Sequence, residues 1–525
     1  MASSTSFPFM KALSLPLTLV LLVSISTDTV WGDRSSQADE LERIRRHIAP
    51  LGHPLADRLP ILTWQNRECP TGLDDGRVGE VQQVFMDRGL SPLCNPVATP
   101  ARAEEYLPVL EYRQERDFPV CILPQGWVQT FFVTDRKGRY KSPHLPPAES
   151  SEEFPCVSAL RDGRHLERGA SQTRQVFTLL RDRGIRVKLL VVDFEAGAYL
   201  RNTGDREKAV QEQAAMARQC PRCVGQFTAE ALSTLDGYAT AVDQSRAFAI
   251  RNILCDPARD VYPSLHVGNF YAWPVNRTPR PAGRWPAYGY EASGMNVAMP
   301  RVYMNAGWGG AGRDQDKMNW NAFFCCLEGY SPAASVLREE ELLIPWVHVW
   351  LGGRYLDHVM RGRKLPEPWV MSEMASHMML RGAETFAIWI DTPGAFPTDY
   401  PYPEYAAMGQ FVYDVKGIQE GFRRMLPFHS FLRRARPMTF DVAGERNELG
   451  PQTATWSGMA AADRALIRTV AFSSGATGVT KRVSIYGRSV PLSFAPQGRN
   501  FWVYPDGRVE PADPSDGKRK SNDRG

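Results

Sequence analysis

Two carboxylates stand at the end of an apolar stretch of the sequence. Residues 187–195 read Val-Lys-Leu-Leu-Val-Val-Asp-Phe-Glu, so Asp193 and Glu195 follow directly on the apolar side chains. Side chains two positions apart on an extended strand lie on the same face. Because close like charges resist ionising together and burial disfavours the charged form, we expect the pKa of one carboxyl to rise. A protonated acid beside an ionised partner is what general acid catalysis requires at neutral pH.

Aromatic and amide side chains end the other strand-like segments. Sugar rings present C–H faces that stack on aromatic rings, and hydroxyls that hydrogen-bond to tyrosine, asparagine and aspartate. We therefore expect a cleft that binds carbohydrate, lined by Tyr271, Trp273, Tyr303, Asn305, Trp308 and Trp389. Asp391, which ends the last segment, is the candidate for a protein nucleophile in a variant of the mechanism.

Strand-like and helix-like segments alternate through the first four fifths of the chain. Several strand-like segments are nearly continuous in aliphatic and aromatic residues, as expected of parallel strands buried on both faces. The alternation predicts an α/β fold, a (β/α)8-type TIM barrel whose active site lies at the C-terminal ends of the strands. An open doubly wound sheet is the alternative, although no GxGxxG or GxxxxGK[ST] motif follows a strand. The strand-like segments are 59–64, 90–97, 118–123, 187–194, 264–273, 300–305, 343–351 and 384–391.

The pattern changes near residue 430. Short segments separated by turn residues replace the helix-like stretches, which predicts a small antiparallel, β-sandwich-like domain over residues 431–510. The preceding residues 33–430 form the expected barrel. Residues 511–525 are rich in Pro, Asp and Lys, and we expect them to be a disordered tail.

The N-terminus has the features of an export signal. Lys11 precedes an apolar run over residues 12–25, and polar residues follow up to Val30-Trp31-Gly32. This pattern predicts a signal peptide over residues 1–32 and a secreted or periplasmic protein, with an uncleaved N-terminal anchor as the alternative. We expect no membrane span in the mature chain, because no later segment approaches the ~20 apolar residues that a span needs.

Several other functions lack the residues that they require. With 62 Lys and Arg against 58 Asp and Glu, the charge balance does not predict nucleic-acid binding. We expect no metal and no cofactor, since HExxH and clustered histidines are absent and Cys220-Pro221-Arg222-Cys223 has no second CxxC pair. Export permits disulfides, and the nine cysteines leave at least one unpaired within the chain. The oligomeric state is left open.

The order of the strand ends resembles that of the hyaluronidase-like glycoside hydrolases. That family carries an Asp-aromatic-Glu motif, then Phe-Tyr-x-aromatic-Pro, then Val-Tyr, and then an aliphatic-Trp strand preceded by a helix with Glu and Gly-Ala. The corresponding segments here are Asp193-Phe194-Glu195, Phe270-Tyr271-Ala272-Trp273-Pro274, Val302-Tyr303, Ile388-Trp389, Glu373 and Gly382-Ala383. The resemblance covers about 200 residues and departs at Phe194, where the family usually has Trp, and at Ala196-Gly197.

The resemblance implies a role for each matched residue. Glu195 would donate the proton to the glycosidic oxygen, and Asp193 would polarise an N-acetyl group whose carbonyl acts as the nucleophile. Tyr271 and Tyr303 would hydrogen-bond that acetamido group, and Trp389 would form the floor of the subsite. The expected function is thus an exported glycoside hydrolase acting on polysaccharide. A non-catalytic glycan-binding barrel and a barrel hydrolase of another substrate class are the alternatives.

Overall fold

The computed structural model describes most of the chain with gaps in its loops. Five of the expected site residues, Asp193, Glu195, Asn305, Trp308 and Asp391, lie outside the described residues, as do residues 1–33 and 513–525. The described residues are 34–64, 75–94, 99–124, 161, 163–192, 214–215, 217–277, 289–304, 314–348, 365–389, 403–442, 444, 448–450, 453–473 and 478–512.

Ten short parallel strands form two five-stranded sheets, with the orders β2-β1-β10-β9-β7 and β3-β4-β5-β6-β8. All pairings within both sheets are parallel. The strands are β1 (Ile61–Trp64), β2 (Leu90–Pro92), β3 (Val120–Ile122), β4 (Val187–Val192), β5 (His266–Asn269), β6 (Val297–Ala298), β7 (Arg301–Tyr303), β8 (Leu342–Leu343), β9 (Trp346–His348) and β10 (Ala387–Trp389).

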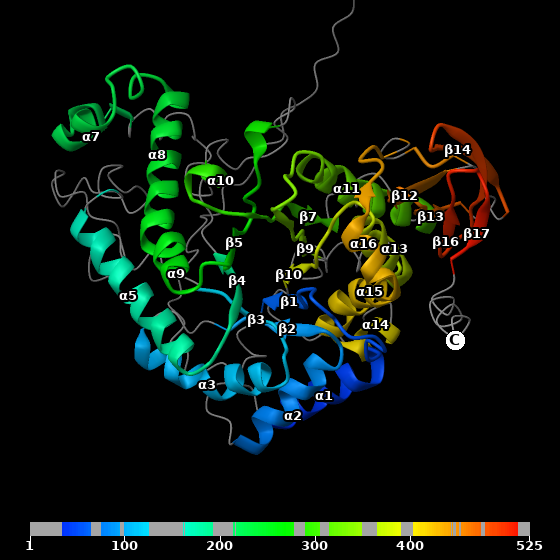
Figure 1. Ribbon diagram of the computed structural model, residues 1–525, viewed down its shortest axis with the longest axis horizontal. Coiled ribbons are helices and arrows are strands. Elements are labelled where there is room, and N and C mark those ends of the chain that lie inside the picture. Colours follow the sequence, from blue (N-terminus) through cyan, green and yellow to red (C-terminus); the bar gives the residue numbers. More distant parts are fainter. Residues whose placement is uncertain are drawn as a thin grey trace, which may run out of the picture.

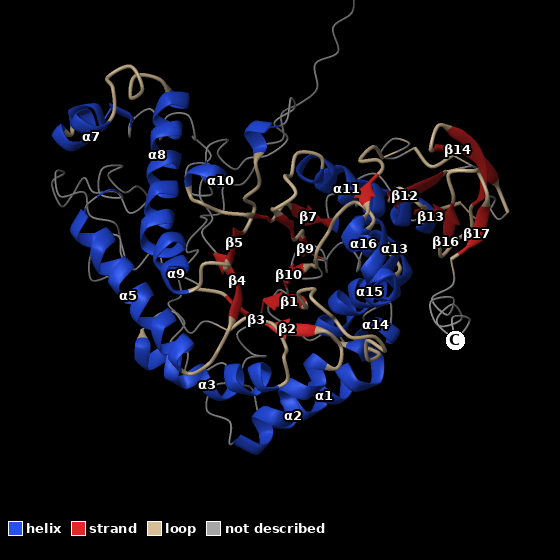
Figure 2. Cartoon of the chain, in the orientation of Figure 1, coloured by secondary structure: helices blue, strands red, loops and turns tan. Residues whose placement is uncertain are grey.

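The two sheets are connected at both edges. An isolated parallel bridge between Cys94 and Ile122 connects the end of β2 to β3. At the other edge the chain itself connects the sheets, because β6 leads into β7 and β8 into β9 within a few residues. In the view of Figure 2 the strands surround the centre and the helices lie outside them. Parallel strands covered by helices agree with the α/β class predicted from the sequence.

Helices cover the outer side of the strands (Figure 1). Their ends follow local capping rules: the Thr99 side chain accepts from the Arg102 amide at the start of α3, and Gly184 with φ +74° follows α5. The helices are α1 (Arg34–His47), α2 (Asp75–Met86), α3 (Pro100–Glu115), α5 (Gly163–Asp182), α7 (Pro221–Gln226), α8 (Leu235–Ile250), η3 (Arg251–Cys255, a π-helix), α9 (Asp256–Val261), η4 (Val275–Arg277), α10 (Gly289–Ala292), α11 (Gln315–Ala334), α13 (Pro368–Met379), α14 (Pro403–Met408), α15 (Gln410–Met425), η6 (Leu426–Phe428) and α16 (His429–Arg434).

The strands are buried on both faces. In β4, Leu189 and Val191 belong to an inner cluster with Phe270 and Trp346, whereas Leu190 and Val192 pack in the outer cluster formed with the helices. This two-sided burial explains why β4 reads as a continuous apolar run. Among the helices that the structure describes, none is long and apolar enough to cross a membrane.

The C-terminal part is antiparallel. Five strands lie in the order β11-β12-β13-β16-β17, and β14 and β15 form a separate hairpin pair. One face of the sheet, with Leu466, Val470 and Trp502, packs into the outer cluster, while Ile467 and Phe501 pack on the opposite face. Figure 1 shows these strands beyond α13 and α16. They are β11 (Arg436–Pro437), β12 (Ala454–Ala460), β13 (Ala465–Ala471), β14 (Thr480–Ile485), β15 (Arg488–Ser493), β16 (Arg499–Val503) and β17 (Val509–Pro511).

Candidate active site at the strand ends

Aromatic and charged side chains gather where the parallel strands end. Trp64 and Trp389 are the last residues of β1 and β10 and are register partners. Tyr303 and His348 are likewise the last residues of β7 and β9 and are register partners. We define the strand-end cluster as Trp64, Tyr271, Arg301, Tyr303, His348 and Trp389. Because parallel strands end at the same edge, the four strand-end rings come together from distant parts of the sequence. Tyr271 follows the end of β5 by two residues, and Arg301 is the first residue of β7.

The rings of the strand-end cluster contact one another in a chain. The centroid of Trp389 lies 6.0 Å from that of Trp64 and 6.3 Å from that of Tyr303. His348 stacks on Trp389 at 4.5 Å, and Tyr303 lies 6.1 Å from Tyr271. These separations lie in the range of favourable aromatic pairs, so the rings form one continuous aromatic surface.

The aromatic surface packs on buried rings on one side and is only partly buried itself. Trp346 is fully buried and meets the Trp64 ring edge-on at 5.7 Å, and Phe270 packs on Trp346 at 4.9 Å. In contrast, Trp64, Tyr303 and Trp389 are half-buried. Rings that are fixed on one side and accessible on the other suit stacking with the apolar face of a ligand.

Tyr271 has an unusual backbone conformation. Its φ is +66°, in the left-handed region that non-glycine residues seldom adopt. Hydrogen bonds hold both neighbours: the Phe270 amide donates to the Val192 carbonyl at 3.0 Å and the Ala272 amide to the Asn269 carbonyl at 2.9 Å. Such strain persists only where the surrounding structure enforces it, and it is concentrated at functional sites.

His348 is neutral at the base of the strand-end cluster. The side chain is fully buried between Tyr303, at 5.0 Å, and Trp389. Burial lowers the pKa of His348 to about 3, because a charged imidazolium would lose its hydration. His348 therefore supplies a neutral ring, and it is not a proton donor at neutral pH.

Arg301 is the charged member of the strand-end cluster. Its side chain is exposed, and the guanidinium carbon lies 4.8 Å from the centroid of the Tyr271 ring and 4.6 Å from that of Tyr303. Nη1 also donates to the Tyr271 hydroxyl. Arg301 is not among the residues predicted from the sequence, although its position two residues before Tyr303 on a strand places both side chains on one face.

The structure brings together three of the six expected binding residues. Tyr271, Tyr303 and Trp389 all belong to the strand-end cluster. Trp273 is only 6% exposed and packs in the outer cluster between strands and helices. Asn305 and Trp308 lie outside the described residues.

The expected catalytic carboxylates also lie outside the described part of the chain. Asp193 and Glu195 follow Val192, the last residue of β4, and Asp391 follows Trp389 by two positions. Val192 is the register partner of Asn269 on β5.

Glu373, one of the residues matched to the hyaluronidase-like family, lies in a buried ion pair that joins structural elements. It is fully buried on α13 and accepts hydrogen bonds from Nε and Nη2 of Arg468 on β13, both at 2.6 Å. Nη1 of Arg424 on α15 donates to the same carboxylate at 2.8 Å. Glu373 thereby connects two helices to the C-terminal sheet. Its hydrogen-bond partners Arg468 and Arg424 are not members of the strand-end cluster.

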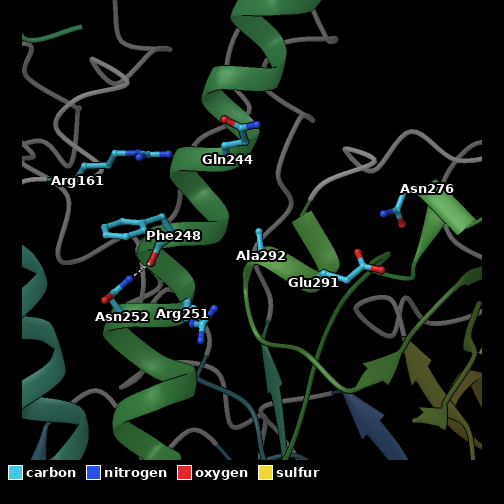
Figure 3. Close-up of a pocket in the computed structure, with 8 residues that line it drawn as sticks. All are labelled: Arg161, Gln244, Phe248, Arg251, Asn252, Asn276, Glu291 and Ala292. Atoms are coloured by element: carbon cyan, nitrogen blue, oxygen red, sulfur yellow. Dashed lines mark hydrogen bonds between the residues drawn. The ribbon is translucent and has the colours of Figure 1, made fainter. Parts of the chain in front are cut away.

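A cavity of about 670 Å³ lies between α8 and α10, away from the strand-end cluster (Figure 3). Arg161 stacks over the Phe248 ring at 5.0 Å and its Nε donates to the Ser245 hydroxyl at 3.0 Å. Arg251 is paired with Asp256 at 3.0 Å. The lining residues are Arg161, Gln244, Phe248, Arg251, Asn252, Asn276, Glu291 and Ala292.

All cysteines that the structure describes are buried except Cys325, which is partly exposed. Cys94 is disulfide-bonded. Cys220 and Cys223 are buried, and burial raises the pKa of the thiols of Cys121 and Cys255 to about 12, which suppresses the reactive thiolate. Within the described ranges, no group of three or more His, Cys, Asp or Glu side chains could hold a metal ion.

Comparison with known proteins finds distant structural likenesses only. No family model matches the sequence. No curated protein matches it either. Among solved structures, the chain is similar to the exo-β-1,4-mannosidase Op5Man5 from Opitutaceae bacterium strain TAV5, with 13% identity and a TM-score of 0.36 over 71% of this chain and 60% of that one.

Two further structures give similar values. A glycoside hydrolase family 5 protein from Bacteroides vulgatus ATCC 8482 has 8% identity and a TM-score of 0.40, covering 86% of this chain and 85% of that one. An isomaltulose synthase from Erwinia rhapontici NX5, in complex with D-glucose, has 7% identity and a TM-score of 0.42, covering 81% and 91%. Because these TM-scores are below 0.5, the likenesses carry no argument about the function of this chain.

Proposed function

We propose that the protein is an exported glycoside hydrolase whose substrate binds at the strand-end cluster. One observation carries the proposal: β4 ends at Val192, one residue before the carboxylate pair, at the same edge as the contacting rings of Tyr271, Tyr303 and Trp389. Hydrolysis of a glycosidic bond uses carboxyl groups, and aromatic rings beside them at the strand ends can bind the sugar by stacking.

The proposal includes a closed (β/α)8 barrel as the scaffold. The strand pairing supports it if β6 with β7, and β8 with β9, each count as one interrupted strand, which reduces the ten strands to eight. The paired neighbours then run from β1 through β2 and onward to β10, which pairs again with β1. The antiparallel strands from residue 436 to residue 511 are proposed to form a small appended domain, which corresponds to the expected domain over residues 431–510.

Glu195 is proposed as the general acid that protonates the glycosidic oxygen as the bond to the leaving sugar breaks. Asp193 would remain ionised and either orient an N-acetyl group of the substrate or stabilise positive charge at the anomeric carbon. Asp391 is the candidate for a direct nucleophile. A carboxyl separation of about 5–5.5 Å from Glu195 would suit that role, whereas about 6.5–9.5 Å would suit an inverting pair.

The test measures reducing ends released from soluble and insoluble polysaccharides, N-acetylated ones included, by the wild type and by Glu195→Gln. The substitution keeps the size of the side chain but removes the proton, so we expect the rate to fall by about 10²–10⁴-fold. Glu339→Gln is a matched control, because the Glu339 side chain is 80% exposed in an ion pair with Arg436, which lies in the C-terminal sheet.

Each outcome decides between functions. Release that is lost only in Glu195→Gln supports the proposal and identifies the substrate class. Equal release by all three proteins removes Glu195 from the mechanism and makes Asp391 the next residue to substitute. No release by the wild type, with polysaccharide retained in a pull-down, would instead support a glycan-binding barrel without catalysis.

A further inference from the structure

A smaller cavity of about 320 Å³ lies where the parallel strands begin, at the opposite end from the strand-end cluster. The backbone at Leu51 places it there, because the Leu51 amide donates to the Asp87 carbonyl at 2.9 Å and β2 begins three residues later, at Leu90. Barrel active sites lie at the other ends of the strands, so this cavity is separate from the proposed hydrolysis. It is lined by Leu51, Gly52, His53, Glu420, Arg423, Arg424 and Pro427.

Arg423 brings hydrogen-bond donors to this cavity that no described residue uses. It lies in the last turn of α15 and is half-buried. Its Nε atom is buried without a hydrogen-bond partner, and among the described residues no hydrogen bond or ion pair reaches its guanidinium. Because a buried donor without an acceptor is unfavourable, a ligand that supplied acceptor oxygens would be stabilised at this position.

The charged side chains around the cavity also carry an excess of positive charge. Within the described part of the chain, four positive side chains, Arg423 included, share only two carboxylates. The negative end of the α15 dipole offsets about half a charge, so more than one positive charge remains. The paired groups are Arg424 and Arg468 on Glu373, at 2.8 and 2.6 Å, and Lys416 on Glu420, at 3.1 Å.

We propose that this cavity binds a tetrahedral dianion of the phosphate type, held by Arg423 with Arg424 beside it. A dianion matches the excess charge better than a monoanion does. The planar fork of a guanidinium matches two phosphate oxygens with paired hydrogen bonds. The bound anion neutralises positive charge next to the Glu373 ion pair, and so stabilises the contact between α13, α15 and the C-terminal sheet. The inference goes beyond the proposed function and does not depend on it.

Isothermal titration calorimetry with inorganic phosphate measures the affinity, at constant ionic strength and at a mildly alkaline pH where phosphate is mainly a dianion. We expect the wild type to bind phosphate at least about tenfold more tightly than acetate. Arg423→Gln should weaken phosphate binding by about 10- to 100-fold, because it removes the paired charge-assisted hydrogen bonds. Arg423→Lys keeps the charge but not the fork, so it should recover only part of the loss.

Two further variants separate a binding role from a structural one. Glu420→Gln removes a negative charge from the cavity wall, so it should tighten phosphate binding by about threefold. Arg161→Gln removes an arginine that stacks on Phe248 in the cavity between α8 and α10, and it should bind phosphate like the wild type. Near-ultraviolet circular dichroism should show these variants folded, since all three side chains are at least partly exposed.

The phosphate group could be free in solution or belong to a lipid headgroup. Co-sedimentation with phosphatidylcholine vesicles, with and without phosphatidic acid, distinguishes the two sources. Binding to the phosphatidic acid vesicles that is lost in Arg423→Gln would assign the site to a headgroup. Calorimetric binding of inorganic phosphate without co-sedimentation would assign it to a free phosphate.

The inference would be overturned if the wild type bound neither inorganic phosphate nor the phosphatidic acid vesicles, or if binding survived in Arg423→Gln. Equal affinity for phosphate and acetate, or weaker phosphate binding by Glu420→Gln, would also reject it. Binding lost only in Arg161→Gln would move the anion to the cavity between α8 and α10. The release of reducing ends is a separate measurement, so hydrolysis can fail while the anion site stands.

Discussion

The buried carboxylate of Glu373 should be among the most important side chains for stability. It is fully buried and accepts three hydrogen bonds, two from Arg468 at 2.6 Å and one from Arg424 at 2.8 Å. Arg468 lies on β13 and its side chain is only 3% exposed. This ion pair therefore connects α13 to the C-terminal sheet with little access to water.

Glu373→Gln removes the negative charge and leaves Arg468 buried without a counter-ion. Breaking a buried pair by removing one partner costs about 3–5 kcal/mol. Arg468 retains two neutral acceptors, Asn500 Oδ1 at 2.8 Å and the Gln497 carbonyl at 3.1 Å, and Arg424 is 31% exposed and can be hydrated. We therefore expect a loss near the lower end of that range, about 3 kcal/mol.

Urea denaturation followed by tryptophan fluorescence measures this loss, because Trp502 lies on β16, two residues after Asn500, which is the register partner of Arg468. Glu339→Gln is the control, since its pair with Arg436 has side-chain exposures of 80% and 75% and should contribute less than about 1 kcal/mol. If Glu373→Gln destabilised the protein no more than the control does, the assignment of Glu373 as a structural counter-ion would be refuted.

Two further predictions concern stability. His348 and His377 are both fully buried; burial lowers the pKa of His348 to about 3, and burial with nearby arginines holds the pKa of His377 well below its usual value. The unfolded chain thus binds more protons below about pH 6.5. As the pH is lowered from 6 to 4, the free energy of unfolding should therefore decrease by up to about 1.4 kcal/mol per pH unit for each histidine. Urea titrations at several pH values measure this decrease, and an unchanged midpoint over that range would contradict the prediction. Gly498 has φ +59° and an added Cβ would lie 2.3 Å from Glu373 Oε2, whereas Gly478, with φ +83°, has nothing within 4 Å. Gly498→Ala should therefore lower the thermal midpoint clearly more than Gly478→Ala, and equal effects would show that the Glu373 carboxylate is not held where the structure has it.

The strands were predictable from the sequence where burial on both faces makes a strand apolar throughout. The run ending at Val192 is apolar on both faces because β4 has helices on one side and the inner cluster on the other. The same reasoning named Tyr303 and Trp389, which end β7 and β10 and pack against the inner cluster.

Features that depend on the neighbours of a strand could not be predicted. Trp64 joins the strand-end cluster because β1 pairs with β10, which is a long-range property of the chain. Trp273 has the same parity as Tyr271, but β5 ends at Asn269 and the left-handed backbone of Tyr271 breaks the alternation, so Trp273 packs in the outer cluster. The role of Glu373 required Arg468, which lies 95 residues away.

The location of bound sugar tests the central claim most directly. A crystal structure of Glu195→Gln with an oligosaccharide of the substrate should show sugar rings against Trp389 and Tyr303, with the side chain at position 195 about 3 Å from a glycosidic oxygen. Oligosaccharide bound instead in the cavity between α8 and α10, with the strand-end cluster empty, would contradict the account.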